Sequence, residues 1–194
     1  MATSGTTSFD LSIEEIIQEA YERCGMTTTS GHSLKSARTS LNLLFAEWAN
    51  RGIHLWKVAL HENALVSGQA EYSVSAGVSD VLEAFISSTA AASNNANTQD
   101  VSLTKIDRSA YAALPNKLAT GQPSQYYVER ETTPKIYLYQ APDLNTYTTL
   151  KYYVIKRIED AGAYTNDADV VFRFLPCMVA GLAYYLAMKN APQL

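Results

Sequence analysis

Cysteine and long apolar runs are scarce in this sequence. Its two cysteines, Cys24 and Cys177, are too few for a disulfide framework, and each falls in a helical apolar pattern where a thiol serves as a small core residue. This favours a reducing compartment, with a single buried disulfide between the two cysteines as the alternative. No apolar stretch reaches the roughly 18 to 20 residues of a membrane span, and residues 1–8 lack a signal peptide's cationic start and apolar run. We expect a protein that is made and used in soluble form, without a membrane partner.

Basic charge is also scarce, and so are the motifs of common enzymes. Fifteen Lys and Arg against 19 Asp and Glu give a net charge of −4 and a pI near 5.4, which argues against a broad basic face that binds phosphates. The sequence contains no G-x-x-x-x-G-K-[ST], no G-x-G-x-x-G after a predicted strand, no G-x-S-x-G and no H-E-x-x-H. Free nucleic acid is therefore not the expected main partner, and no enzyme class is indicated.

The three histidines do not form a metal-binding pattern. His54 and His61 lie seven residues apart on one predicted strand or strand pair and so point to opposite faces, while His32 lies in a predicted loop. No cysteine or carboxylate cluster completes a tetrahedral set beside them. We expect ordinary exposed or hydrogen-bonded histidines, no metal and no cofactor.

The paired carboxylates are better explained by structure than by catalysis. Glu14 and Glu15 fit a helix start, where negative side chains favour the amino-terminal end of the helix dipole. A glycosidase needs two carboxyls about 5 to 9 Å apart across a cleft, and the sequence does not place Glu129 or Glu159 in such a pair. We predict no catalytic residues, and a cell-wall hydrolase using Glu14, Glu129 or Glu159 is the enzyme alternative.

Two amphipathic helices are predicted near the amino terminus. Ser12 and Glu15 form a capping box that starts the first helix, and Gly25 stands where a left-handed closing residue is expected. Ser33 or a neighbour can cap the second helix, and residues 27–32 connect the two. One apolar stripe on each helix predicts an antiparallel hairpin. The stripes consist of Ile13, Ile16, Ile17, Ala20, Tyr21 and Cys24 in the first helix and of Leu34, Ala37, Leu41, Leu44, Phe45 and Trp48 in the second.

A DNA-binding helix-turn-helix is the alternative interpretation of this pair. The connection at residues 27–32 is longer than the three or four residues that hold a recognition helix at its angle. The second helix has Lys35, Arg38 and Arg51 as its cations, and they do not cluster in its first half as base readout requires. A core-forming hairpin is favoured, and a DNA-binding regulator is the alternative.

From residue 54 onward the apolar period changes from helical to strand-like. Val58 and Leu60 occupy every second position, which is the spacing of residues on one face of a strand. Further short apolar runs follow, separated by Gly and Pro residues that are typical of turns. Asp107 can cap one short helix within this region. Residues 87–99 contain Ser, Ala, Asn, Thr and Gln but no large apolar residue, and we predict that they form a mobile hairpin tip.

The end of the chain predicts a last helix and completes the expected fold. Asp167 or Asp169 can cap this helix, Pro176 either kinks it or belongs to its first turn, and the small Gly181 allows a neighbouring helix to approach. We expect an α+β fold. Its parts are a small helix bundle of residues 10–53 and 167–190, and a β-rich insertion of residues 54–166 that forms an antiparallel sheet or small barrel with one short helix.

Several stretches, in order, resemble one known family. They are residues 36–44 (SARTSLNLL), 47–52 (EWANRG), 68–74 (GQAEYSV), 80–84 (DVLEA), 114–117 (LPNK), 121–123 (GQP) and 126–128 (YYV). Their order and spacing over residues 10–189 resemble the head-to-tail adaptors of short-tailed phages, also called tail tubular protein A or tail accessory factor. No single stretch is specific, since each short piece also occurs elsewhere.

The resemblance implies a structural, non-enzymatic subunit of the virion at the head-tail junction. Members of that family form a ring, commonly of twelve copies, that docks beneath the portal protein, offers a platform to the tail nozzle (a tail tubular protein B-like component) and lets viral DNA pass through its axis. Tail fibres are a further candidate partner. Members usually continue past the last helix into a segment that reaches the portal, whereas this sequence stops at Leu194.

A ring subunit needs two different lateral faces and segments that become ordered on assembly. The two termini and the loop at residues 87–99 suit the second requirement. The candidate interface residues are Phe9, Arg38, Arg51, Asn94, Asn95, Lys189 and Asn190. The alternative function is another neck or tail component, such as a head-completion or tail-terminator protein.

Overall fold

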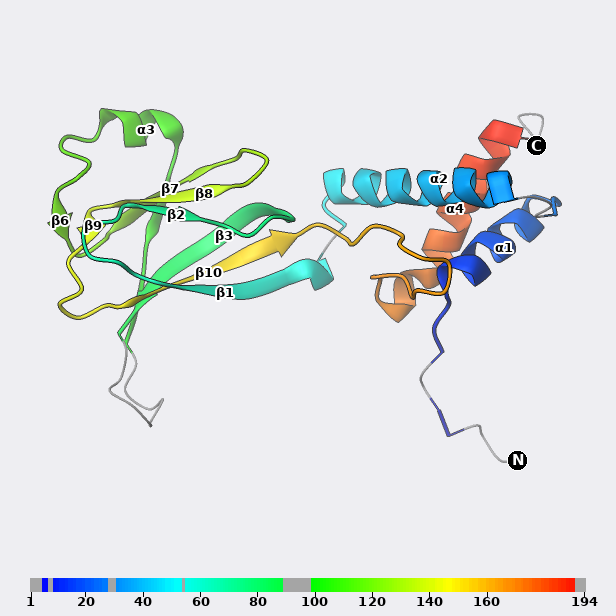
Figure 1. The fold of residues 1–194 in the computed structure, drawn as a ribbon, viewed down its shortest axis with the longest axis horizontal. Coiled ribbons are helices and arrows are strands. Elements are labelled where there is room, and N and C mark those ends of the chain that lie inside the picture. The colour runs from blue at the N-terminus through cyan, green and yellow to red at the C-terminus, as the bar shows by residue number, and fades with distance from the viewer. Residues whose placement is uncertain (1–4, 7–8, 28–30, 54, 89–98, 191–194) are drawn as a thin grey trace. The chain divides into compact units, whose positions relative to one another are not determined.

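The computed structural model describes residues 5–6, 9–27, 31–53, 55–88 and 99–190. Tertiary contacts divide the chain into two compact units (Figure 1). The helical unit consists of Met1–Trp56 and Ile158–Leu194, and the β unit consists of Lys57–Arg157. Each unit has its own hydrophobic core. The fold is α+β, as the sequence predicts.

The helical unit begins with α1 (Ile13–Arg23), which starts at the predicted capping box. The Ser12 hydroxyl accepts a hydrogen bond from the Glu15 amide at 3.3 Å, and the Glu15 carboxylate accepts one from the Ser12 amide at 2.8 Å. Gly25 ends this helical segment with a φ of 67°, a conformation that glycine adopts without a Cβ clash. Both predicted signals are confirmed.

Helix α4 (Leu175–Asn190) packs against both α1 and α2 (Gly31–Asn50). It lies close to α2 at Gly181, where a Cβ atom would be 3.0 Å from both methyl groups of Leu44. The predicted close helix approach is therefore confirmed at this glycine. Helix α2 begins earlier than predicted, at Gly31, so the Ser33 cap was wrong.

The start of α4 corrects a second cap prediction. A 3₁₀ turn, η3 (Phe172–Phe174), leads directly into α4, and its capping residue Val171 makes no side-chain cap bond. The Asp169 carboxylate instead accepts a hydrogen bond from the Glu159 amide at 3.0 Å. Pro176 is the second residue of α4, where its missing N–H removes no helical hydrogen bond. The first-turn interpretation of Pro176 is thus the right one.

The β unit contains two four-stranded sheets and a two-stranded ladder. The first sheet has the order β1 (Val58–Ala64), β10 (Thr149–Lys156), β3 (Val78–Ser87) and β4 (Asp100–Ser102). The second has the order β2 (Glu71–Ser73), β8 (Lys135–Tyr139), β7 (Gln125–Glu129) and β5 (Thr104–Ile106). The ladder pairs β6 (Thr120–Gly121) with β9 (Ala141–Pro142), and η1 (Leu55–Lys57) precedes β1.

The two four-stranded sheets share one core, to which the inner faces of both contribute. The largest fully buried side chains of this core are Tyr126, Tyr152, Ile86, Ile136, Leu138 and Leu150. Most strand pairs are antiparallel, but β5 pairs with β7 and β6 with β9 in parallel. Among the described strands there is no closed barrel, so the sheet rather than the small barrel is the observed arrangement.

The short helix α3 (Arg108–Ala113) follows β5 and packs on β7. The Asp107 carboxylate accepts a hydrogen bond from the Ala110 amide at 2.6 Å, which confirms the predicted cap. The predicted hairpin tip at residues 87–99 lies mostly outside the described residues. Where the chain is described again, the Ser88 amide donates to the Gln99 carbonyl at 3.0 Å.

The two cysteines lie in different environments, and both are free thiols. Cys24 is buried, and its thiol donates to the Ala183 carbonyl at 3.2 Å. Cys177 is exposed on α4, so the prediction that both thiols are core residues was wrong for Cys177. The helical pattern around Cys177 indicated the helix correctly but not the face on which this residue lies.

Candidate interaction surfaces

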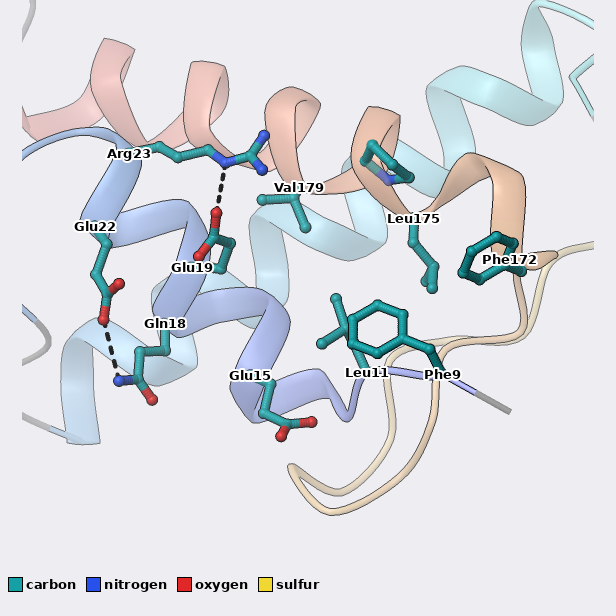
Figure 2. Close-up of a pocket in the computed structure, with 11 residues that line it drawn as sticks. Phe9, Leu11, Glu15, Gln18, Glu19, Glu22, Arg23, Phe172, Leu175 and Val179 are labelled. Carbon is teal, nitrogen blue, oxygen red and sulfur yellow. Dashed lines mark hydrogen bonds and ion pairs between the residues drawn. The ribbon is translucent and has the colours of Figure 1, made fainter. Parts of the chain in front are cut away.

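A pocket of about 470 Å³ lies on the helical unit, between the amino-terminal segment, α1 and the start of α4 (Figure 2). Backbone hydrogen bonds hold that segment in place, because the Ile13 and Glu14 amides donate to the carbonyls of Asn166 and Tyr164 at 2.8 and 2.9 Å. The pocket is lined by Phe9, Leu11, Glu15, Gln18, Glu19, Glu22, Arg23, Phe172, Leu175, Pro176 and Val179. Its lining therefore combines apolar and acidic side chains.

Two phenylalanines stand at the apolar side of this pocket and form what we call the aromatic ridge. Phe9 is 63% exposed and Phe172 is 64% exposed. Their rings meet edge to face with centroids 6.3 Å apart, a favoured geometry for aromatic pairs. Figure 2 shows the Phe9 ring next to Leu11 and the Phe172 ring next to Leu175. The two rings thus form a contiguous exposed apolar group, the kind of feature that marks an interaction surface when it extends over a larger patch.

The α1 side of the pocket carries three carboxylates and one guanidinium. Glu19 pairs with Arg23 at 2.8 Å, and Glu22 accepts from the Gln18 amide group at 3.2 Å. The hydrogen bond from the Ser12 backbone lowers the pKa of Glu15, and the bond to the Ser12 hydroxyl acts in the same direction. Glu15 is therefore negatively charged at neutral pH, and this side of the pocket is acidic.

A second apolar surface lies on the outer side of the first sheet, and we call it the open sheet face. Val58 pairs with Ile155, and Leu60 with Tyr153, in the register of β1 and β10. Val58, Leu60 and Tyr153 are 40, 44 and 38% exposed. Phe85 of β3 completes the surface, with its ring centroid 6.2 Å from that of Tyr153.

Basic residues flank one end of the open sheet face. Lys57 precedes β1, while Lys156 and Arg157 lie at and just after the end of β10, so all three are at the same end of the antiparallel pair. At the other end, Lys151 pairs with Glu62 at 3.7 Å. Glu83 of β3, an exposed residue, stands directly opposite Tyr153 in the strand register. The open sheet face is therefore apolar in the middle and carries charges of both signs around it.

The second sheet carries a tyrosine cluster that also includes a tyrosine of α3. The rings of Tyr111, Tyr127 and Tyr137 lie 5.4 to 6.0 Å apart. The Tyr137 hydroxyl donates to Glu129 at 3.0 Å. Burial raises the pKa of Tyr137, and the hydrogen bond to Glu129 raises it further. Because α3 supplies Tyr111, this cluster attaches the helix to the sheet.

A second pocket on the β unit, of about 510 Å³, is lined partly by basic side chains, but two of them are engaged internally. Arg130 donates to Asp80 at 2.8 Å, and Lys105 lies 3.5 Å from the same carboxylate. Burial acts to raise the pKa of Asp80, but the hydrogen bonds from Arg130 and the charge of Lys105 outweigh it, so the pKa is lowered. This network connects β3 of the first sheet to the second sheet.

The candidate residues from sequence lie at separate places in the structure. Phe9 forms part of the aromatic ridge. Arg38 donates to the Gly162 carbonyl at 3.1 Å and lies over the ring of Tyr164. Lys189 donates to the Ser40 hydroxyl at 2.6 Å, and Asn190 donates to a carbonyl of its own helix. Asn94 and Asn95 lie outside the described residues.

Arg51 lies at a smaller pocket of about 400 Å³ between α2 and α4. It pairs with Glu47, which also accepts a hydrogen bond from the Tyr185 hydroxyl at 2.6 Å. That hydrogen bond lowers the pKa of Glu47, and Arg51 adds to the effect. Tyr184, 64% exposed, lines the same pocket. Arg51 thus remains on the surface beside an exposed aromatic ring.

Sequence reasoning missed Phe172 and the open sheet face. The alternation of Val58 and Leu60 was visible, but in the structure these are the outward residues, while Ala59 packs on the core of the β unit. His61, on the inner side, contacts the ring of Tyr152, and burial lowers its pKa. The signal in the sequence that could have predicted this face is the presence of apolar residues at the outward positions of both β1 and β10.

Among the described residues, no group of three or more His, Cys, Asp or Glu side chains could hold a metal ion. Glu129 accepts a hydrogen bond from Tyr137, and Glu14 is an exposed residue of the first turn of α1. Within the same part of the chain, no helix has the length and apolar character needed to cross a membrane.

The model of the SU10 adaptor protein family matches residues 14–193, nearly the whole chain. The protein belongs to the SU10 adaptor family. This is a family of structural phage adaptors rather than enzymes, and membership implies a component of the virion. The resemblance to phage head-to-tail adaptors is confirmed at the level of the adaptor, but the match does not single out the tail tubular protein A family. No curated protein matches the chain.

Proposed function

We propose that this SU10 adaptor is the ring-forming connector between the portal and the tail of a phage particle, with viral DNA passing through the axis of the ring. The observation that carries the proposal is the family match over residues 14–193. The partners are further copies of the chain, commonly to a total of twelve in the resembling head-to-tail adaptors, the portal protein and the tail nozzle. Tail fibres are a further partner in this proposal.

The surfaces of the described residues support such a role. A closed ring made of one kind of chain needs two different faces on each subunit, because each copy contacts two neighbours in a head-to-tail manner. The aromatic ridge and the open sheet face are two exposed apolar surfaces of different composition. Neither belongs to a set of residues suited to catalysis.

The charge of the chain is compatible with DNA passage. A net charge of −4 gives weak repulsion between a subunit and the phosphate backbone. Weak repulsion would let a duplex slide along a channel without being held there, whereas a strongly basic lining would retain it.

The test is the assembly state of the purified full chain, alone and with purified portal rings. We expect native mass measurement and negative-stain images to show closed rings, or rings formed upon the portal. A chain that stays strictly monomeric and ignores portal rings would overturn the proposal. Rings that bind the end of a tail tube but never the portal would instead favour a tail-terminator role.

A further inference from the structure

Strand β1 ends its sheet with a long open edge. Of the four strands that end the two four-stranded sheets, β2, β4 and β5 have three residues each, whereas β1 has seven (Figure 1). Proteins protect long sheet edges with lysine, proline or a covering segment, because unpaired backbone groups there can take up another strand. Strand β1 contains neither lysine nor proline. It is therefore the edge that is suited to accept a further strand.

Backbone hydrogen bonds show which groups of β1 face this edge. The Leu65 amide donates to the Thr148 carbonyl at 2.8 Å, one position beyond the last pair of the β1–β10 ladder. Hydrogen-bonded and non-hydrogen-bonded pairs alternate in an antiparallel ladder, so Leu60, Glu62 and Ala64 direct their amides and carbonyls away from β10. Among the described residues, no other backbone group bonds to these amides and carbonyls. We call them the free edge of β1.

Residues 1–8 (MATSGTTS), which we call the amino-terminal arm, have the length and composition of a strand for this edge. The arm contains no charged side chain, no proline and three threonines, which are favoured in strands. Without proline, each of its residues keeps an amide that can pair. Eight extended residues reach about 26 Å, compared with about 23 Å for the seven residues of β1. The arm is therefore long enough to cover the free edge.

The arm leaves the helical unit at an exposed position. Phe9, which follows the arm, is 63% exposed. Gly5 and Thr6, the residues of the arm that the structure describes, are exposed as well. The chain is anchored to the helical unit by the backbone bonds of Ile13 and Glu14. An arm that begins at the surface can extend toward another subunit without opening the core of its own.

We infer that, in the ring, the amino-terminal arm of one copy adds to the free edge of β1 in the next copy, as a fifth strand of that sheet. The inference rests on the proposed function and names the contact that links neighbouring subunits. Backbone groups of the arm pair with those of Leu60, Glu62 and Ala64, and its side chains lie beside Val58 and Leu60. Each subunit gives its arm at one place and receives an arm at another, so the contact repeats around a ring.

Hydrogen exchange of the full chain tests this strand addition amide by amide. In assembled protein, the amides of Leu60, Glu62 and Ala64 should exchange more slowly than in dilute, unassembled protein, by about tenfold or more. The amides of His61 and Asn63 bond to β10 and should be protected in both states, which provides a control within the same strand. Mass spectrometry with fragmentation of the peptide that contains β1 resolves the individual amides.

Two kinds of variant remove the two sides of the contact. Deletion of residues 2–8 removes the arm and leaves the β unit unchanged, so we expect rings to be lost and the free-edge amides to exchange rapidly at every concentration. On the other side, Glu62→Pro removes an amide of the free edge. Its matched control is Glu62→Thr, which loses the same pair with Lys151 but keeps the amide.

Glu62→Pro should need about fivefold more protein for half-assembly than Glu62→Thr, as expected for the loss of a hydrogen bond. Sedimentation measures assembly, and circular dichroism verifies that each variant is folded. If Glu62→Pro is unfolded, the deletion decides the question, because residues 2–8 belong to neither hydrophobic core.

The outcomes separate this inference from the proposed function. Rings that persist without residues 2–8 would show that the lateral contact lies elsewhere, which overturns the inference and leaves the connector role intact. Slow exchange of the free-edge amides in dilute monomer would contradict it as well, because the arm then pairs within its own chain. Protection that requires portal rings would assign the edge to another protein instead. An unchanged protein that never assembles, even with portal rings, would overturn the connector role and this contact with it.

Discussion

At the scale of single residues, Asp80 is a charge of the β unit that is held by two cations. It accepts hydrogen bonds from Arg130, lies near Lys105 and is three-quarters buried. Because its carboxylate belongs to β3 and both cations belong to the second sheet or its turn, the contact fixes one sheet against the other. Removing the charge leaves two cations beside each other without their partner.

We predict that Asp80→Asn lowers the thermal midpoint of the β unit at pH 7. The pKa of Asp80 is lowered in the folded protein, so its contribution to stability is present above the ordinary pKa near 3.8 and is lost as the pH falls through the lowered value. The difference between the variant and the unchanged protein should therefore shrink below pH 3.8. Asp100→Asn, at an exposed residue of β4, serves as the control. A difference that stays constant down to pH 2 would contradict this account.

The two thiols should differ sharply in their reaction with a thiol reagent. Cys177 is exposed and Cys24 is buried with its thiol hydrogen-bonded to Ala183. In the native protein we expect rapid modification of one thiol, identified by peptide mapping as Cys177, and modification of Cys24 only after denaturant is added. Equal rates in the native protein would mean that the core of the helical unit opens readily.

At the scale of elements, the capping box and helical period predicted α1 well because their determinants are local. Ser12 and Glu15 satisfy each other's amides within four residues. The caps assigned to Asp167 and Asp169 failed because both residues are tied to other segments: the Asp169 carboxylate accepts from the Glu159 amide, and the backbone of Asp167 forms a β-bridge with Ser12. Such contacts join residues that are distant in sequence, and no local pattern specifies them.

The packing of α4 on α2 gives a prediction at this scale. Gly181→Leu should destabilise the helical unit by about 1 to 3 kcal/mol, because a larger side chain must displace Leu44. Ala180→Leu is the matched control, since Ala180 is exposed on the adjacent position of the same helix. Urea denaturation followed by helical circular dichroism measures both. Equal stability of the two variants would show that α2 and α4 separate at little cost.

At the scale of the whole molecule, the acidic balance of the chain separates an adaptor from a DNA-binding regulator. Arg38 and Lys189 are engaged in hydrogen bonds within the helical unit, and Arg51 pairs with Glu47. These residues do not form a basic stripe along one element. Under the proposed function, such a charge balance would let DNA pass without being bound tightly by any one subunit.

We predict that the isolated protein does not retard a DNA duplex in a gel at about 50 to 200 mM salt. A chain that binds phosphates through several cations would show strong binding at the lower salt and loss of binding at the higher. A salt-dependent shift of that kind would favour the helix-turn-helix interpretation of α1 and α2. The family match and the negative net charge both predict that no shift occurs.

Residue order alone was enough to predict the α+β class, the start of α1, the small-residue approach at Gly181 and an adaptor function. These features depend on local hydrogen bonds, on the spacing at which apolar residues recur, or on the order of motifs along the chain. Only the tertiary structure decided that Phe9 meets Phe172 and that Val58 and Leu60 face outward. The reason is physical: an alternating strand has two possible inward faces, and the face that becomes buried is the one on which the second sheet packs.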